Sequence, residues 1–161
     1  MSHRIYIYNA AEPSEQNDSD IMMVEWGYEI PFLLQSLLVD GGFVAPNIYN
    51  IYNEANNSGL YYNAKPGIQN LKKLYTFIEN HQAELIDDTD RFLQAKEQLF
   101  NFLDTLTAPY FHVDAWDVFN MDDKPHESQA QQMLVDVKQN NDVIANAIAA
   151  DDASMLDIKL F

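Results

Sequence analysis

The amino-acid sequence predicts an α+β fold, with about four helices packed on a small mixed or antiparallel sheet in a single domain over residues 1–161. Stretches of apolar residues at helical spacing are mixed with short alternating stretches, without the regular strand–helix order of a doubly wound fold. The length of 161 residues suits one domain with a core of its own. With 47% apolar and 12% aromatic residues, the composition is that of a folded chain.

The first predicted strand covers residues 4–8, Arg-Ile-Tyr-Ile-Tyr. These residues alternate, so that Ile5 and Ile7 face one way and the flanking arginine and tyrosines face the other. Residues 10–20 are polar and contain a proline, which predicts a loop.

The next part of the chain predicts a short helix and a long loop. Residues 31–40 are rich in Leu and Phe, with Pro31 suited to the first helical position and Gly41 to the position after the end. Within residues 43–52 we expect one short strand. Residues 47–63 are rich in Asn, Tyr, Gly and Ser, which favour turns, and are therefore predicted to be mostly loop.

Two longer helices are predicted over residues 68–85 and 90–106, because apolar residues recur there at helical spacing. The Asp-Asp-Thr-Asp segment at 87–90 offers N-cap residues and acidic residues for the first turn of the second helix. Because few residues join the two helices, we expect them to form an antiparallel hairpin.

Pro109 ends this hairpin, and a second strand is predicted over residues 110–116. Its alternation places His112, Asp114 and Trp116 on one face with Tyr110, and the apolar residues Phe111, Val113 and Ala115 on the other. The polar face of this strand is therefore a candidate for a functional surface.

The C-terminal part predicts a long helix followed by a short strand. Ser128 and Gln131 match a capping box at the start of a helix over 128–149. Residues 156–160 alternate between apolar and charged residues, which predicts the last strand.

The charge of the chain restricts its partners. Nine Lys and Arg residues stand against 25 Asp and Glu residues, which gives a formal net charge of −16. Nucleic-acid binding is not expected, because scattered basic residues do not form a phosphate-binding patch. The longest apolar run, residues 30–39, is too short to span a bilayer, and the short apolar stretch in residues 1–9 does not predict a signal sequence. We expect a cytoplasmic protein that avoids membranes and binds basic proteins.

No motif for catalysis, a metal or a cofactor is present in the sequence. There is no cysteine, which excludes disulfides, thiolate nucleophiles and cysteine zinc sites. The five glycines form no phosphate-binding loop, and no serine nucleophile motif occurs. We therefore expect no enzyme activity. The alternative is a metal-dependent or small-molecule enzyme built around His112, Asp114 and Asp117, which offer nitrogen and oxygen ligands.

Acidic residues gather in two stretches without Lys or Arg, namely residues 12–29 with six acids and residues 110–123 with four. Such stretches either keep the protein soluble or steer a basic partner. Tryptophans lie among these acids, either as core residues or as binding anchors. The Tyr-rich and Asn-rich segment has the composition of a recognition loop. The predicted contact residues are, in order of preference, Asp114, Trp116, Asp117, Asp122 and Asp123, then Glu25 and Trp26, then Tyr49, Tyr52, Tyr61 and Tyr62.

The start of the chain resembles a group of known proteins. Residues 2–9, Ser-His-Arg-Ile-Tyr-Ile-Tyr-Asn, are followed after a polar loop by residues 28–33, Tyr-Glu-Ile-Pro-Phe-Leu. This arrangement is similar to small acidic bacterial immunity proteins of polymorphic toxin systems. The resemblance covers about the first 40 residues and implies a protein that binds one cognate toxin domain and blocks its active site or its substrate access. Binding to another basic partner, as an acidic scaffold or regulatory protein, is a further alternative.

Overall fold

The computed structural model describes residues 3–49 and 56–156. In this part of the chain, five strands form one sheet in the order β2-β1-β5-β4-β3, and all neighbouring strands are antiparallel. The strands are β1 (Arg4–Ala10), β2 (Ile21–Gly27), β3 (Phe43–Pro46), β4 (Ser58–Asn63) and β5 (Tyr110–Asp114). The predicted α+β class is thereby confirmed.

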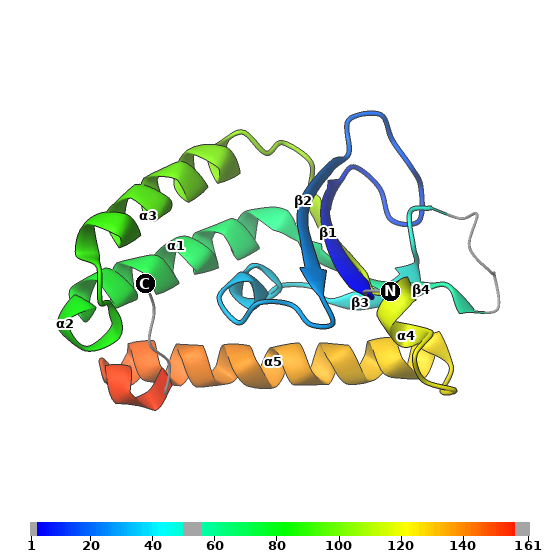
Figure 1. The fold of residues 1–161 in the computed structure, drawn as a ribbon. Helices are drawn as coiled ribbons and strands as arrows, with labels where there is room; N and C mark the ends of the chain where they lie inside the picture. Colours follow the sequence, from blue (N-terminus) through cyan, green and yellow to red (C-terminus); the bar gives the residue numbers. More distant parts are fainter. Residues whose placement is uncertain (1–2, 50–55, 157–161) are drawn as a thin grey trace.

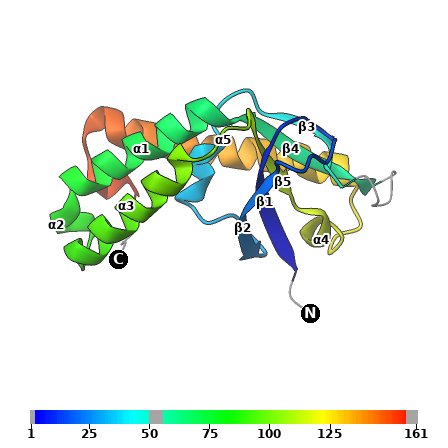
Figure 2. The ribbon, with the colours of Figure 1, turned by 90° about the horizontal axis from the view of Figure 1, so that it is seen from above.

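The helices lie beside and beneath the sheet (Figures 1 and 2). They are α1 (Ala64–Asn80), α2 (Gln82–Leu85), α3 (Thr89–Asp104), α4 (Trp116–Phe119) and α5 (His126–Ala150), with short 3-10 helices η1 (Leu34–Leu37) and η3 (Ala153–Leu156). Figure 1 shows α5 running under both the sheet and the α1–α3 hairpin. Among the helices described, none combines the length and the apolar run needed to cross a bilayer.

The sheet is buried on both faces at its centre. The face that we call the helix face carries Ile7, Leu60 and Val113, which pack into the main core with residues of α1, α3 and α5. The opposite face, which we call the aromatic face, carries Tyr8 and Tyr61 in a second, smaller cluster. The central strands therefore carry large side chains on both faces, and in β4 the residues on both faces are buried.

The predicted hairpin of two helices is confirmed. Tyr75 of α1 stacks on Phe92 of α3, with ring centroids 5.7 Å apart. Ion pairs join Lys72 to Asp104 and Glu79 to Lys96, so contacts further along α1 are made earlier in α3, as antiparallel helices require.

Of the two helix starts predicted from capping residues, the start of α3 is confirmed and the start of α5 is wrong. The side chain of Asp88 accepts a hydrogen bond from the backbone N–H of Arg91, which confirms the N-cap of α3. The predicted capping box in α5 is wrong, because that helix begins at His126 and Ser128 lies inside its first turn. The Ser128 hydroxyl donates to the carbonyl of Pro125 instead.

Strand β2 was not predicted. A β-bulge shifts its register against β1 between Ile7 and Tyr8, which leaves Met23 without a partner position in the ladder. The extra residue breaks the period of two, so the sequence Ile-Met-Met-Val reads as a continuous apolar run rather than as an alternating strand.

The prediction of loop over residues 47–63 is wrong for β4. This strand lies between β3 and β5, and four of its six residues, Gly59 to Tyr62, are buried. Gly59 marks a close approach rather than a turn, because a Cβ there would overlap Asn47 Oδ1 and lie 2.8 Å from the carbonyl oxygen of Val113.

The helix predicted over residues 31–40 is reduced to the single turn of η1. Side chains from other helices satisfy its carbonyls: Asn70 donates to Ser36, and Asn141 donates to Gln35 and Leu38. These bonds replace those that a continuing helix would supply. At the C-terminus, Leu156 belongs to η3 rather than to the strand predicted over 156–160, and the rest of that prediction lies outside the described residues.

Candidate functional site

A hollow of about 330 Å³ opens on the aromatic face where β5 leads into α4. It is lined by Tyr6 and Tyr8 of β1, Asp114 of β5, and Trp116 and Asp117 of α4. Three of the residues predicted to contact a partner, Asp114, Trp116 and Asp117, therefore lie together around this hollow.

The register of the sheet adds a third carboxylate. Tyr6 lies opposite Asp114 of β5 on one side and opposite Glu25 of β2 on the other. Side chains opposite one another in an antiparallel sheet point to the same face, so Glu25 borders the hollow. Its carboxylate lies 3.7 Å from Nε of Arg4.

The local electrostatic potential is negative. Partial burial raises the pKa of the Tyr6 phenol, and the charges of Glu25, Asp117 and Asp114 raise it further. The charge of Arg4 opposes this shift but does not reverse it. A cation placed in the hollow would therefore be attracted by the charges of carboxylates in β2, β5 and α4.

Hydrogen bonds fix the wall formed by Asp114 and Trp116. Asp114 is only 2% exposed, and its Oδ1 accepts a hydrogen bond of 3.0 Å from the backbone N–H of Trp116. The indole N–H of Trp116 donates to the carbonyl of Asn56 at 3.1 Å. The ring stands edge-on to His126. Trp116 is thus half-buried: part of its side chain packs against the protein, and part lines the hollow, where a ligand can reach it.

A buried histidine supports the aromatic face beside the hollow. The ring of His112 lies 4.2 Å from the ring of Tyr61, and Tyr8 stacks more distantly on it. Its Nδ1–H donates to the carbonyl of Leu60. Burial lowers the pKa of His112 to about 4, so the imidazole is neutral at pH 7.

The alternative metal centre at His112, Asp114 and Asp117 is not supported by this geometry. His112 is fully buried, and Nδ1 is occupied by a backbone carbonyl. Over residues 3–49 and 56–156, no three His, Asp or Glu side chains converge as metal ligands do. The strand face that the sequence predicted to be polar and accessible is therefore largely interior at His112.

The predicted tyrosine contacts need correction. Tyr61 is fully buried: its hydroxyl donates to the carbonyl of Pro46 and accepts the backbone N–H of Ser14. Tyr62 is 4% exposed and belongs to the core of the helix face. In this conformation Tyr61 cannot contact a partner, and Tyr62 exposes too little of its side chain to anchor one.

The other predicted tyrosines differ in position. Tyr49 is half-buried and meets Tyr8 edge-on, with the ring centroids 5.6 Å apart. It therefore lies on the aromatic face. Tyr52 lies outside the described residues.

The remaining predicted contact residues lie away from the hollow. Asp122 and Asp123 are exposed in the turn after α4, where Asp122 accepts the backbone N–H of Lys124. Trp26 is 51% exposed and follows Glu25 directly in β2, so the two side chains point to opposite faces of the sheet. The residues predicted to form one contact surface therefore lie at separate places on the protein.

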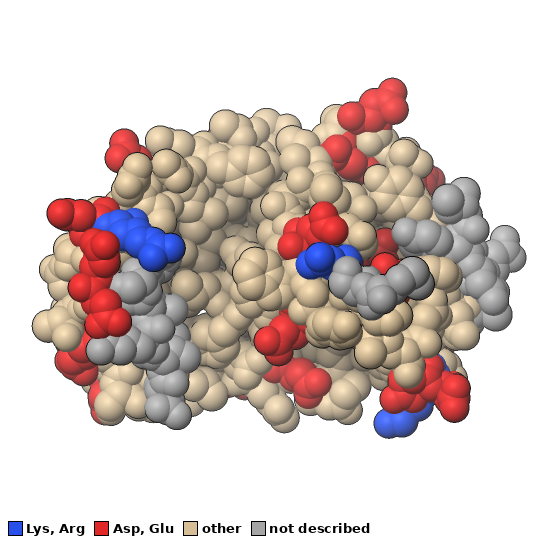
Figure 3. All heavy atoms as spheres, in the orientation of Figure 1, with Lys and Arg blue, Asp and Glu red and all other residues tan. Residues whose placement is uncertain are grey.

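The excess negative charge lies in the N-terminal and C-terminal parts of the chain, whereas the α1–α3 hairpin is nearly balanced. Residues 3–49 contain seven Asp or Glu and one Lys or Arg, whereas residues 64–104 contain seven acids and five bases. Figure 3 shows the acids in several separate groups on the face that it presents, with few basic side chains among them. In the hollow, the acids lie beside the aromatic side chains of Tyr6, Tyr8 and Trp116.

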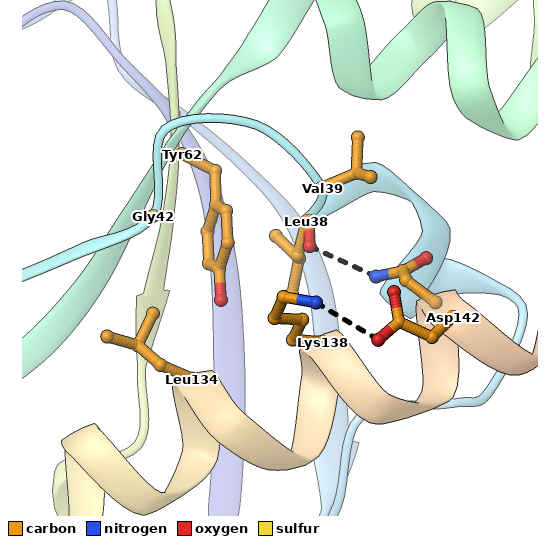
Figure 4. Close-up of a pocket in the computed structure, with 8 residues that line it drawn as sticks. Leu38, Val39, Gly42, Tyr62, Leu134, Lys138 and Asp142 are labelled. Carbon is orange, nitrogen blue, oxygen red and sulfur yellow. Dashed lines mark hydrogen bonds and ion pairs between the residues drawn. The ribbon is translucent and has the colours of Figure 1, made fainter.

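A second cavity, of about 340 Å³, lies between α5 and the segment that joins η1 to β3 (Figure 4). Leu38, Leu134 and the ring of Tyr62 supply much of its lining. Its two charged residues, Lys138 and Asp142, form an ion pair of 3.0 Å with each other. These charges offset one another, so this cavity has less to attract a charged ligand than the hollow.

Tyr6 and Tyr8 are the hollow residues that were not among the predicted contacts. The alternation over residues 4–8 already places both tyrosines on one strand face. It does not indicate which later segment adjoins that face, because the pairing of β1 with β5 spans most of the chain.

Comparison with known proteins yields one match. A family model described as "Domain of unknown function (DUF7822)" matches residues 9–153, which include Asp114, Trp116 and Asp117. No curated protein and no solved structure shows significant similarity to the chain.

Proposed function

Since the chain belongs to the family described as "Domain of unknown function (DUF7822)", we propose a function from its own surface: it binds a basic protein at the hollow and has no catalytic activity. In its specific form, the proposal is a cytoplasmic bacterial immunity protein that neutralises a cognate basic toxin domain. The observation that carries it is the convergence of three carboxylates from three elements on two aromatic walls.

The hollow suits the side chain of an arginine or a lysine. Tyr6 and Trp116 offer ring faces for a cation–π contact, and Asp117 offers acceptors for charge-assisted hydrogen bonds. The buried carboxylate of Asp114 adds negative charge behind them. Arg4 is the only Lys or Arg before Lys65, and its guanidinium is already next to Glu25. A partner would therefore supply the missing positive charge.

Two features support the immunity form of this proposal. The net charge of −16 would accelerate encounter with a basic domain, as electrostatic steering does in other tight complexes. The N-terminal residues resemble those of small acidic immunity proteins. If neighbouring genes encode no protein with a basic C-terminal domain, the immunity form is wrong, and an acidic scaffold that binds another basic protein takes its place.

We predict that Asp117→Asn weakens binding of the basic C-terminal domain encoded by the neighbouring gene by about tenfold, while Asp123→Asn changes it by less than about threefold. Both changes remove one charge, but only Asp117 lines the hollow. Binding kinetics at two salt concentrations provide the measurement. The association rate of the wild-type protein should fall as salt is added.

Equal effects of the two variants would show that net charge, and not the hollow, controls binding. An association rate that does not depend on salt would contradict steering altogether. The circular dichroism spectra of both variants should match that of the wild type, because Asp123 is exposed and Asp117 is only half-buried.

A further inference from the structure

Strand β2 is an open edge of the sheet. It is the last strand in the order and pairs with β1 alone. Its seven residues make it a long edge strand, and Ile21, Met22 and Trp26 are 40%, 52% and 51% exposed. The backbone groups on the outer side of such a strand form a template for another strand.

The opposite edge of the sheet is protected in a way that β2 is not. Strand β3 has only four residues and ends at Pro46, which cannot donate a ladder hydrogen bond. Strand β2 contains neither Lys nor Pro, the residues that commonly block edge pairing. Its bulge near Met23 leaves Val24 to Gly27 as the regular part, paired residue by residue with Arg4 to Ile7.

The two sides of this regular part differ in chemistry. Glu25 points to the aromatic face, beside the carboxylates of the hollow, whereas Trp26 points to the helix face. An added strand would place alternate side chains on these two faces. The matching pattern is therefore a basic residue toward Glu25 and an apolar residue toward Trp26, repeated along the strand.

We infer that an extended segment of the basic partner, with alternating basic and apolar residues, docks on β2 as a sixth strand. This inference rests on the proposed function and specifies how the partner is held: main-chain hydrogen bonds supply affinity, and the two faces supply specificity. A second copy of the chain is a poorer occupant, because the pairing would bring two molecules of charge −16 together.

The test uses the whole protein and an octapeptide of alternating lysine and valine. Backbone amide exchange, followed by NMR, should show new protection within Val24 to Gly27 when the peptide is added. A glutamate–valine octapeptide and a lysine–valine octapeptide interrupted by proline should bind at least about tenfold more weakly. Trp26→Lys places a charge at the edge and should weaken peptide binding to a similar extent.

The matched control is Val135→Lys, which makes the same change in charge at a residue of α5 that is 48% exposed. Peptide binding that protects amides elsewhere, or that Trp26→Lys and Val135→Lys weaken equally, would overturn docking at β2. Sedimentation that shows a dimer with protected β2 amides in the free protein would assign the edge to a second copy. None of these results decides the proposed function, because binding of a basic partner at the hollow is tested separately by the kinetics of Asp117→Asn, a residue outside β2.

Discussion

Replacing Gly67 with alanine is expected to destabilise the protein by about 3 kcal/mol, although alanine favours helices by about 1 kcal/mol over glycine. A Cβ at this position in α1 would overlap the carbonyl oxygen of Leu37 and lie 2.9 Å from its carbonyl carbon. Both atoms are backbone. Asn70 and Asn141 hold the carbonyls on either side of Leu37, so η1 cannot move aside without losing those bonds.

Urea denaturation followed by circular dichroism measures this effect, with Gly27→Ala as the control. The atom nearest to a Cβ at Gly27 is the end of the Arg4 side chain, 3.7 Å away, so the control should remain within about 0.5 kcal/mol of the wild type. A Gly67→Ala variant as stable as the wild type would show that α1 and η1 do not pack as closely as described here.

Acid should destabilise the fold through His112. Burial lowers its pKa from 6.5 to about 4, so the unfolded chain binds a proton more readily than the folded one. Stability is therefore lost as the pH falls from about 6.5 toward 4, by up to about 3 kcal/mol, and this contribution becomes constant at lower pH. Burial also lowers the pKa of His126, which acts in the same direction.

His112→Phe tests this prediction, because it keeps a ring against Tyr61 but cannot bind a proton. Its free energy of unfolding should change less between pH 6.5 and 4 than that of the wild type, whatever the offset at neutral pH. The carboxylates are common to both proteins, so the difference between the two curves isolates the histidine.

His81→Gln is the control for this experiment. A hydrogen bond to Asp151 raises the pKa of the half-buried His81, so its contribution is present below pH 6.5 and is lost as the pH rises through the raised value. Removing it should leave the loss of stability in acid intact. A loss of stability between pH 6.5 and 4 that is as large in His112→Phe as in the wild type would mean that the imidazole is protonated without cost in the folded state.

Local patterns in the sequence predicted the elements that depend on local contacts. The α1–α3 hairpin, β1 and β5 follow from periodicity, and Asp88 caps α3 as its residue type indicated. The predictions failed where contacts between residues far apart in the sequence determine the local structure. The bulge hides β2, and burial on both faces removes the alternation of β4.

The candidate site shows the same division. Asp114, Trp116 and Asp117 are neighbours in sequence and stay together in the hollow. Tyr6 and Tyr8 join them only through the pairing of β1 with β5, which no local pattern encodes. The burial of Tyr61 depends in turn on bonds to Pro46 and Ser14, one of them 47 residues away in the sequence.

The neighbourhood of β1 and β5 also determines when the protein can fold. The side chain of Asn9 bonds to the carbonyl of Ala108, which lies 99 positions further along the chain. During synthesis, the edge of β1 that pairs with β5 therefore stays unpaired until about two thirds of the chain has left the ribosome. Contacts of such long range make folding slow, and a waiting strand edge invites association with other chains. Until β5 has been made, that edge is therefore a site at which a chaperone can protect the nascent chain from association.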